Sequence, residues 1–321
     1  MKRIAFLPGL ISALLTSGIV LPAIAQVTSD NTTNTTVNST GNNFNILNGI
    51  QRGGNLFHSF SEFSIPTGGS ATFNNSSAIE NIINRVTGGN ISSVDGLIQA
   101  NGNANLFLIN PSGIVFGENA KLNIGGSFLG TTAESILFED GFKFSAVNAQ
   151  TEPLLTVSVP LGLQIGSNSG SITVQGNGHA LTGGAFFPLN LNNTTTGLKV
   201  NQGETLGLIG TEINLTGGII RVPGGNIQLS SIEEGALKLD NSSSSWQFDT
   251  SQVQKFGNIN LSKKSLLDTG GVVTGDIQLQ GKNITLKDAS AVIIQNNGTL
   301  HKGNNTLNAK DTIAISEELR T

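Results

Sequence analysis

The sequence predicts an all-β protein, and within that class a parallel β-helix, a solenoid in which short strands wind into stacked coils. Three observations favour it. Within residues 103–132, short apolar runs each end at an Asn, Pro, Ser or Gly turn and restart a few residues later. Similar strand starts recur at 225–229, 257–261 and 275–279. Helical periodicity is almost absent beyond Ala25.

The recurring strands alternate between apolar and polar residues, as half-buried strands do. Coils stacked about 4.8 Å apart would pair each backbone with its neighbours and align the apolar side chains in inward columns. Gln228, Asn260 and Gln278 lie between them and are expected to face solvent. The unequal spacing indicates coils of unequal length, and an antiparallel β-sandwich is the alternative that such strands leave open. The expected inward residues are Ile227, Leu229, Ile259, Leu261, Ile277 and Leu279.

One segment departs from the strand pattern. Residues 78–86 place Ile79, Ile82, Ile83 and Val86 at helix-like spacing. We expect at most a short helix or a turn there.

The N-terminal segment 1–25 has the three parts of a secretory signal peptide. Lys2 and Arg3 precede an apolar stretch that is followed by a small-residue site ending at Ala25, so the mature chain is expected to begin at Gln26. A membrane anchor is the alternative, but prolines and glycines interrupt the apolar stretch and the cleavage site follows at once. The chain is therefore expected to be exported.

Composition narrows the class of function. The chain carries 17 Lys and Arg against 21 Asp and Glu, and only 12% of its residues are charged. Because the cationic side chains that neutralise phosphates are scarce, we expect no nucleic-acid partner. Cysteine is absent, so core packing and backbone hydrogen bonds must hold the exported protein together without disulfides.

Three stretches, in this order along the chain, resemble the filamentous-haemagglutinin N-terminal domain, the secretion domain of two-partner-secreted exoproteins, in its cyanobacterial-type variant. They are 51–63, 79–90 and 103–132, and with the strands between them the resemblance spans residues 27–270. It implies a right-handed parallel β-helix of the pectin lyase-like type, with an N-terminal cap and small extra-helical β elements.

The resemblance also implies partners and a location. The Sec machinery would deliver the chain to the periplasm, and an outer-membrane β-barrel transporter with POTRA domains would recognise the extended secretion domain by strand addition. The domain would then fold outside the cell as part of a secreted or surface-attached exoprotein of the adhesin or haemagglutinin kind.

The third stretch contains a turn similar to one of the family's motifs. Asn110, Pro111, Ser112, Gly113 and Ile114 resemble the family's Asn-Pro-Asn-Gly-Ile, with Ser in place of the second Asn. The proline fixes φ at the first corner, and the glycine can adopt the positive φ that restarts a strand. We hypothesise that the transporter reads this turn.

The expected organisation is a signal peptide at 1–25, the secretion domain at 26–270 and the start of β-helical passenger repeats at 271–321. We expect the chain to be a truncated piece of a longer exoprotein, with a naturally short exoprotein as the alternative. A host-cell, glycan or other surface target would be bound through the missing passenger.

No pattern typical of a chemical site is present. After residue 26 no two Asp residues lie within seven positions of each other, and His58, His179 and His301 are isolated in the sequence. The sequence therefore predicts no enzyme, no catalytic residue, no metal site and no cofactor. Residues of neighbouring coils can still converge, so a β-helical polysaccharide lyase or hydrolase, or a self-contained carbohydrate-binding module, is the alternative.

Two clusters have plain structural interpretations. Glu233 and Glu234 are expected at a solvated corner rather than as a catalytic pair. His58 lies beside Phe57 and Phe60, and we expect it in an aromatic cap with a hydrogen bond to a loop.

Overall fold

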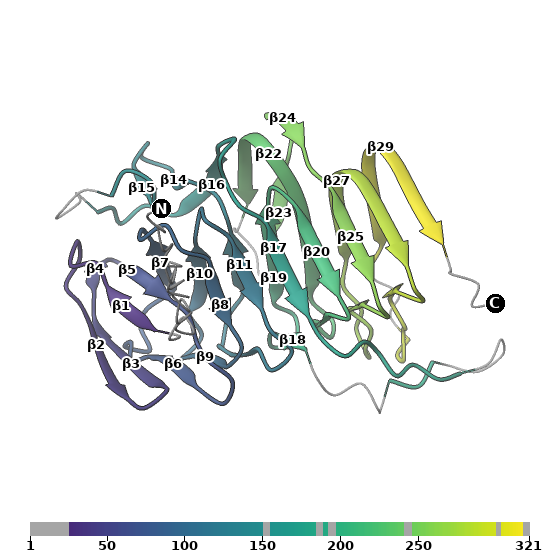
Figure 1. Cartoon of the computed structure of the whole chain (residues 1–321), viewed down its shortest axis with the longest axis horizontal. Coiled ribbons are helices and arrows are strands. Elements are labelled where there is room, and N and C mark those ends of the chain that lie inside the picture. The colour runs from purple at the N-terminus through teal and green to yellow at the C-terminus, as the bar shows by residue number, and fades with distance from the viewer. Residues whose placement is uncertain are drawn as a thin grey trace, which may run out of the picture.

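The computed structural model describes residues 26–149, 155–183, 189–191, 197–240, 246–299 and 303–316. Within them every regular element is a β-strand, and no helix there is long and apolar enough to cross a bilayer. The strands lie side by side along the longest axis of the molecule, from β5 towards the N-terminal end to β29 at the C-terminal end (Figure 1). The predicted parallel β-helix is confirmed. The expected signal peptide, with Ala25 at its end, lies outside the described residues.

The first side of the β-helix is a parallel ladder with one strand from each coil. Its strands are β5 (Asn55–Phe63), β7 (Asn81–Val86), β10 (Asn105–Ile109), β13 (Phe128–Thr131), β19 (Thr205–Gly210) and the first parts of β22 (Asn226–Asp240), β27 (Ile277–Lys287) and β29 (Asn305–Ser316). Neighbouring strands place apolar side chains in register, and these residues are almost fully buried. The column consists of Leu56, Ile82, Leu106, Phe128, Leu206, Ile227 and Ile277.

Two further sides complete each coil. The second side contains β8 (Ser92–Val94), β11 (Ile114–Phe116), β17 (Ile172–Gln175), β20 (Ile213–Thr216), β25 (Ile259–Ser262) and the later parts of β27 and β29. The third side contains β3 (Asn43–Asn48), β6 (Ser70–Phe73), β9 (Leu97–Ala100) and β12 (Lys121–Asn123), followed by β18 (Leu198–Lys199), β21 (Ile219–Arg221), β26 (Leu266–Asp268) and β28 (Ala291–Ile293).

The recurring strand starts occupy two sides of the helix rather than one. Ile227 pairs with Ile277 on the first side, whereas Ile259 pairs with Ile284 on the second. The number of residues between the first and the second of the recurring strand starts is therefore not the length of one coil. All six expected inward residues are buried and pair in register with apolar residues of the next coil, so the prediction that they face inward in columns is confirmed.

Coil length varies because some coils carry insertions. The ladder neighbours Leu106 and Phe128 bound one of the short coils, whereas the coil between Phe128 and its next neighbour Leu206 is much longer. The longer coil contains β14 (Ser135–Phe138), β15 (Lys143–Ser145) and β16 (Pro160–Ile165). A later insertion contains β23 (Gln247–Asp249) and β24 (Val253–Phe256).

These inserted strands form an extra-helical antiparallel sheet with the later part of β22. In Figure 1 β14, β15, β16 and β24 lie above the stacked coils. The sheet covers the outer face of the first side, where Phe57, Ile83, Phe107 and Leu129 form a second buried column with the inserted aromatic residues. The first side is consequently buried on both faces in this region.

Two sequence expectations fail because of this two-sided burial. Residues 81–86 form the strand β7, buried throughout, instead of a helix or turn. Ile82 and Val86 face the inner core while Ile83 faces the extra-helical sheet, so apolar residues at helix-like spacing fill two different cores. Gln228 is 1% exposed instead of solvated, because Trp246 lies over it and the Gln228 side-chain amide approaches the Trp246 carbonyl at 3.5 Å.

The N-terminal end of the helix is closed by antiparallel strands. β1 (Val27–Ser29) and β4 (Ile50–Arg52) both pair antiparallel with β5, and β2 (Thr35–Thr40) forms a hairpin with β3. A first coil without such strands would expose an unpaired edge to other chains. The N-terminal cap expected from the family resemblance is present.

Candidate functional site

The turn at 110–114 joins β10 to β11, where the chain passes from the first side of the helix to the second. Asn110 is completely buried. Its side-chain oxygen accepts a hydrogen bond from the Ser112 backbone N–H at 3.0 Å, which folds the turn onto itself. Gly113 has φ of 125°, a conformation that side chains of L-residues rarely adopt. The sequence expectation of a positive φ at this glycine is confirmed.

The same turn is tied to the coils on both sides of it. The Asn110 side-chain amide donates to the Asn90 carbonyl at 2.8 Å and to the Ser92 hydroxyl at 2.9 Å, both in the preceding coil. The Asn110 backbone N–H donates to the Thr131 carbonyl at 2.9 Å. The Pro111 carbonyl accepts from the Gly170 N–H at 2.6 Å. In the folded protein the asparagine side chain is therefore part of the packing between coils and is closed to any other molecule.

An asparagine ladder runs along the outer edge of the first coils. The Asn81 amide donates to the Asn55 side-chain oxygen, and the Asn105 amide donates to the Asn81 oxygen, each at 3.0 Å. The Asn105 oxygen in turn accepts from the Ser127 backbone N–H at 2.9 Å. Asn55 and Asn81 belong to the first two stretches of the family resemblance, and the ladder explains in physical terms why amides stand at equivalent positions of successive coils.

Arg85 is the charged residue that sequence reasoning missed. It is 2% exposed, on the outer face of β7. Its guanidinium donates to the Ser59 hydroxyl at 2.8 Å, to the Thr32 hydroxyl at 2.9 Å and to the Ser145 carbonyl at 2.7 Å. The signal in the sequence was a lone arginine inside an otherwise apolar and amide-containing strand.

Asp30 belongs to the same network. Its carboxylate accepts hydrogen bonds from the hydroxyls of Ser59, Thr32 and Thr87 and from the Thr32 N–H. The pKa of Asp30 lies below its ordinary value: burial raises it, and these hydrogen bonds together lower it by more. The Ser59 and Thr32 hydroxyls thus link the carboxylate to the guanidinium of Arg85.

The histidines serve packing where they are described. His58 is buried, contacts the rings of Phe60 and Phe73 at centroid distances of 6.1 and 5.4 Å, and lies 3.0 Å from the Thr35 hydroxyl. Burial lowers the pKa of His58 to about 3, so the ring is neutral. His179 contacts the Ala289 carbonyl at 2.8 Å, and His301 lies outside the described residues.

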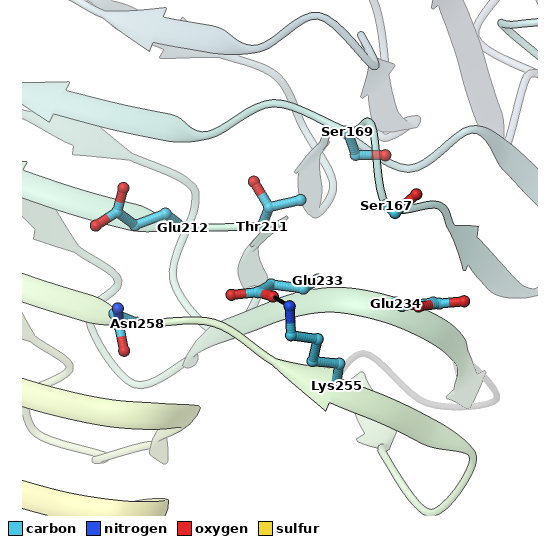
Figure 2. A pocket seen from close by; sticks show the side chains of 8 residues that line it. All are labelled: Ser167, Ser169, Thr211, Glu212, Glu233, Glu234, Lys255 and Asn258. Carbon is cyan, nitrogen blue, oxygen red and sulfur yellow. Dashed lines mark ion pairs between the residues drawn. The ribbon is translucent and has the colours of Figure 1, made fainter.

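No group of three or more acidic, histidine or cysteine side chains with metal-binding geometry occurs in the described part of the chain. One polar cleft does bring carboxylates of different coils together (Figure 2). It lies where β16, β20, β22 and β24 approach one another and has a volume of about 380 Å³. It is lined by Ser167, Ser169, Thr211, Glu212, Glu233, Glu234, Lys255 and Asn258.

Two carboxylates of this cleft have partners of their own among the neighbouring side chains. The Glu233 carboxylate forms an ion pair with Lys255, and its hydrogen bond and charge raise the pKa of that amine. Glu212 accepts a hydrogen bond from the Asn260 amide at 3.1 Å. Figure 2 shows the side chains of Glu212 and Glu234 pointing in opposite directions. Glycoside hydrolysis needs two carboxyl groups that face each other across the scissile bond, and Glu212 and Glu234 do not face each other in this way.

Comparison with known proteins identifies the family. The TPS (two-partner secretion) secretion domain model matches residues 25–279. The heme/hemopexin-binding protein of Haemophilus influenzae is 40% identical over 58 residues, which are 18% of this chain and 6% of that protein. The HMW1 secretion domain of Haemophilus influenzae, a crystal structure, aligns with a TM-score of 0.47 and 17% identity over 91% of this chain and 83% of that one. Because the family model covers most of its length, the chain belongs to the TPS secretion domain family.

Proposed function

We propose that this chain is the secretion domain of a longer, cyanobacterial-type exoprotein of the adhesin or haemagglutinin kind, and that it has no enzymatic activity. The observation that carries the proposal is the family match over residues 25–279. The matched curated relative is many times longer than the aligned segment, which supports a separate passenger as the part that contacts a host cell, a glycan or another surface.

The proposed route begins with the Sec machinery and cleavage between Ala25 and Gln26. An outer-membrane transporter with POTRA domains then takes the chain by strand addition, and the chain folds as a β-helix outside the cell. The domain would extend over 26–270 and the first passenger repeats over 271–321. Strands β25 and β27 pair across that boundary, which supports a passenger with the same architecture.

We further propose that the transporter reads the turn at 110–114 while the chain is still extended. Support comes from the burial of Asn110 and from its bonds to Asn90 and Ser92, because a folded turn has no free side-chain amide to offer. In an extended chain the same amide and the neighbouring backbone groups are open to a receiving sheet edge.

The test is an export assay with the full chain, with and without a cognate two-partner transporter. The proposal expects release into the medium only when the transporter is present, and equal release in both conditions would refute it. The turn is tested with Asn110→Ala against Ile259→Val, a core change that also lowers stability, by about 0.5–1.5 kcal/mol, but leaves the turn unchanged. Loss of export for Asn110→Ala alone supports recognition at the turn, whereas equal export of the two variants contradicts it.

A further inference from the structure

The Arg85 side chain joins two parts of the molecule that are far apart in sequence. On one side Thr32 and Asp30 follow β1, in the N-terminal cap. On the other side β15 supplies the Ser145 carbonyl and the ring of Phe144, whose centroid lies 4.4 Å from the guanidinium carbon. The guanidinium therefore lies between the cap and the extra-helical sheet, and it contacts both.

A guanidinium keeps its charge at all ordinary pH values, so it is stable in a buried place only when its donors are satisfied. If β15 docked while the cap was absent, Arg85 would lose the Thr32 hydroxyl and the nearby Asp30 carboxylate while being covered. If the cap docked while β15 was absent, the Ser145 carbonyl and the Phe144 ring would be missing. Each half thus makes burial of Arg85 more favourable for the other.

We infer that Arg85 couples docking of the N-terminal cap to docking of the extra-helical sheet. The first coils therefore become stable only once Ser145 has packed against them. The network spans Asp30 to Ser145, and the turn at 110–114 lies inside that interval. When the chain is exported N-terminus first, residues 30–145 therefore stay loosely packed until β15 has docked. The coupling is a property of the folded chain alone, and only its role in export rests on the proposed function.

Coupling between two sites is reciprocal, so it can be tested from either side. Asp30→Asn weakens the cap side, since Asp30 bonds to Thr32, Ser59 and Thr87. Phe144→Leu weakens the β15 side by removing the ring over the guanidinium. Amide hydrogen exchange of the purified mature chain then measures local opening at β1 and at β15 separately.

Each variant is expected to raise exchange on both sides by about tenfold, because Asp30→Asn weakens hydrogen bonds to a charged group and Phe144→Leu removes the cation–π contact with Arg85. Arg85→Gln should do the same, and β25 to β28 should be unaffected. Arg221→Gln is the matched control, because it removes a half-buried arginine paired with Asp268 at 3.0 Å in a later coil. It should leave both β1 and β15 unchanged.

Exchange that rises only at β1 for Asp30→Asn and only at β15 for Phe144→Leu would overturn the inference. This holds even if Arg85→Gln does not fold, since the two flanking variants leave the arginine in place. No transporter enters the experiment, so failure of the export assay and failure of this inference are distinguishable.

Discussion

The indole of Trp246 stacks on the ring of Phe107, with ring centroids 5.3 Å apart and ring planes 22° apart. Phe107 lies on the outer face of β10, and Trp246 stands directly before β23. This contact joins the parallel helix to the extra-helical sheet, and both rings are buried. Trp246 is the one tryptophan of the sequence, so its fluorescence reports specifically on this junction.

Trp246→Ala is expected to lower the free energy of unfolding by about 3–5 kcal/mol, because it removes a large side chain from a closed core. Urea denaturation followed by circular dichroism measures the change. Val272→Ala is the control, since Val272 is 69% exposed and its loss should stay within about 0.5 kcal/mol. A Trp246 variant as stable as the control would contradict the assignment of the second core.

Gly113→Val is expected to cost about 1–3 kcal/mol through backbone strain at a φ of 125°. A Cβ at this position would also lie 3.2 Å from the Ser171 carbonyl oxygen of the next coil. Thermal unfolding of the purified variant tests this. Ser112→Ala changes the same turn but leaves the backbone N–H that the turn uses, and it should be nearly neutral. Equal melting temperatures for the two variants would disprove the strain.

Asn110→Ala is expected to destabilise the fold by about 1–3 kcal/mol, because the Asn90 carbonyl and the Ser112 N–H lose a buried partner. Denaturant unfolding measures the loss. Asn148→Ala, a change at an exposed asparagine, should have little effect. If both changes were neutral, the amide would not be holding the coils together.

The stability of the protein should depend on pH through His58. Its pKa is about 3 in the folded protein and 6.5 ordinarily. Between these values the unfolded chain binds a proton that the folded protein does not. The free energy of unfolding is therefore intact above pH 6.5 and falls as the pH drops, by about 1.4 kcal/mol per pH unit.

His58→Asn removes this titration. Denaturation at several pH values between about 4 and 6 should show a shallower loss of stability for the variant than for the unchanged chain. Acidic groups with lowered pKa values, such as Asp30, titrate in both proteins and cancel in the difference. Identical slopes for the two proteins would mean that His58 is not buried in its neutral form.

Much of the β-helix could be predicted from the sequence, because the strands that form its inner face repeat a simple alternation of apolar and polar residues. Ile227 and Leu229, like Ile277 and Leu279, alternate with polar residues, and a buried strand with one apolar face requires that alternation. The turn at Gly113 was also readable, since proline and glycine restrict or free the backbone locally. These features depend on a few neighbouring residues and on nothing distant.

The remaining features depend on segments that come together only in three dimensions. Gln228 is polar and alternates correctly, yet Trp246 covers it from an insertion in the same coil. The sequence of strand β7 lacks the alternation of apolar and polar residues, because its opposite faces enter two different cores. Arg85 finds partners at Thr32, Ser59 and Ser145, and no local pattern connects those positions.

The asparagine ladder favours the correct alignment of each new coil with the coil before it. Backbone pairing alone accepts a strand shifted along its neighbour, and a shift by one residue turns every side chain to the opposite face. In this protein such a shift would bring Leu56 or Ile82 opposite an amide and would break the bonds that join Asn55, Asn81 and Asn105. The ladder thus stabilises the correct register of each coil as that coil forms, and it needs no later part of the chain to do so.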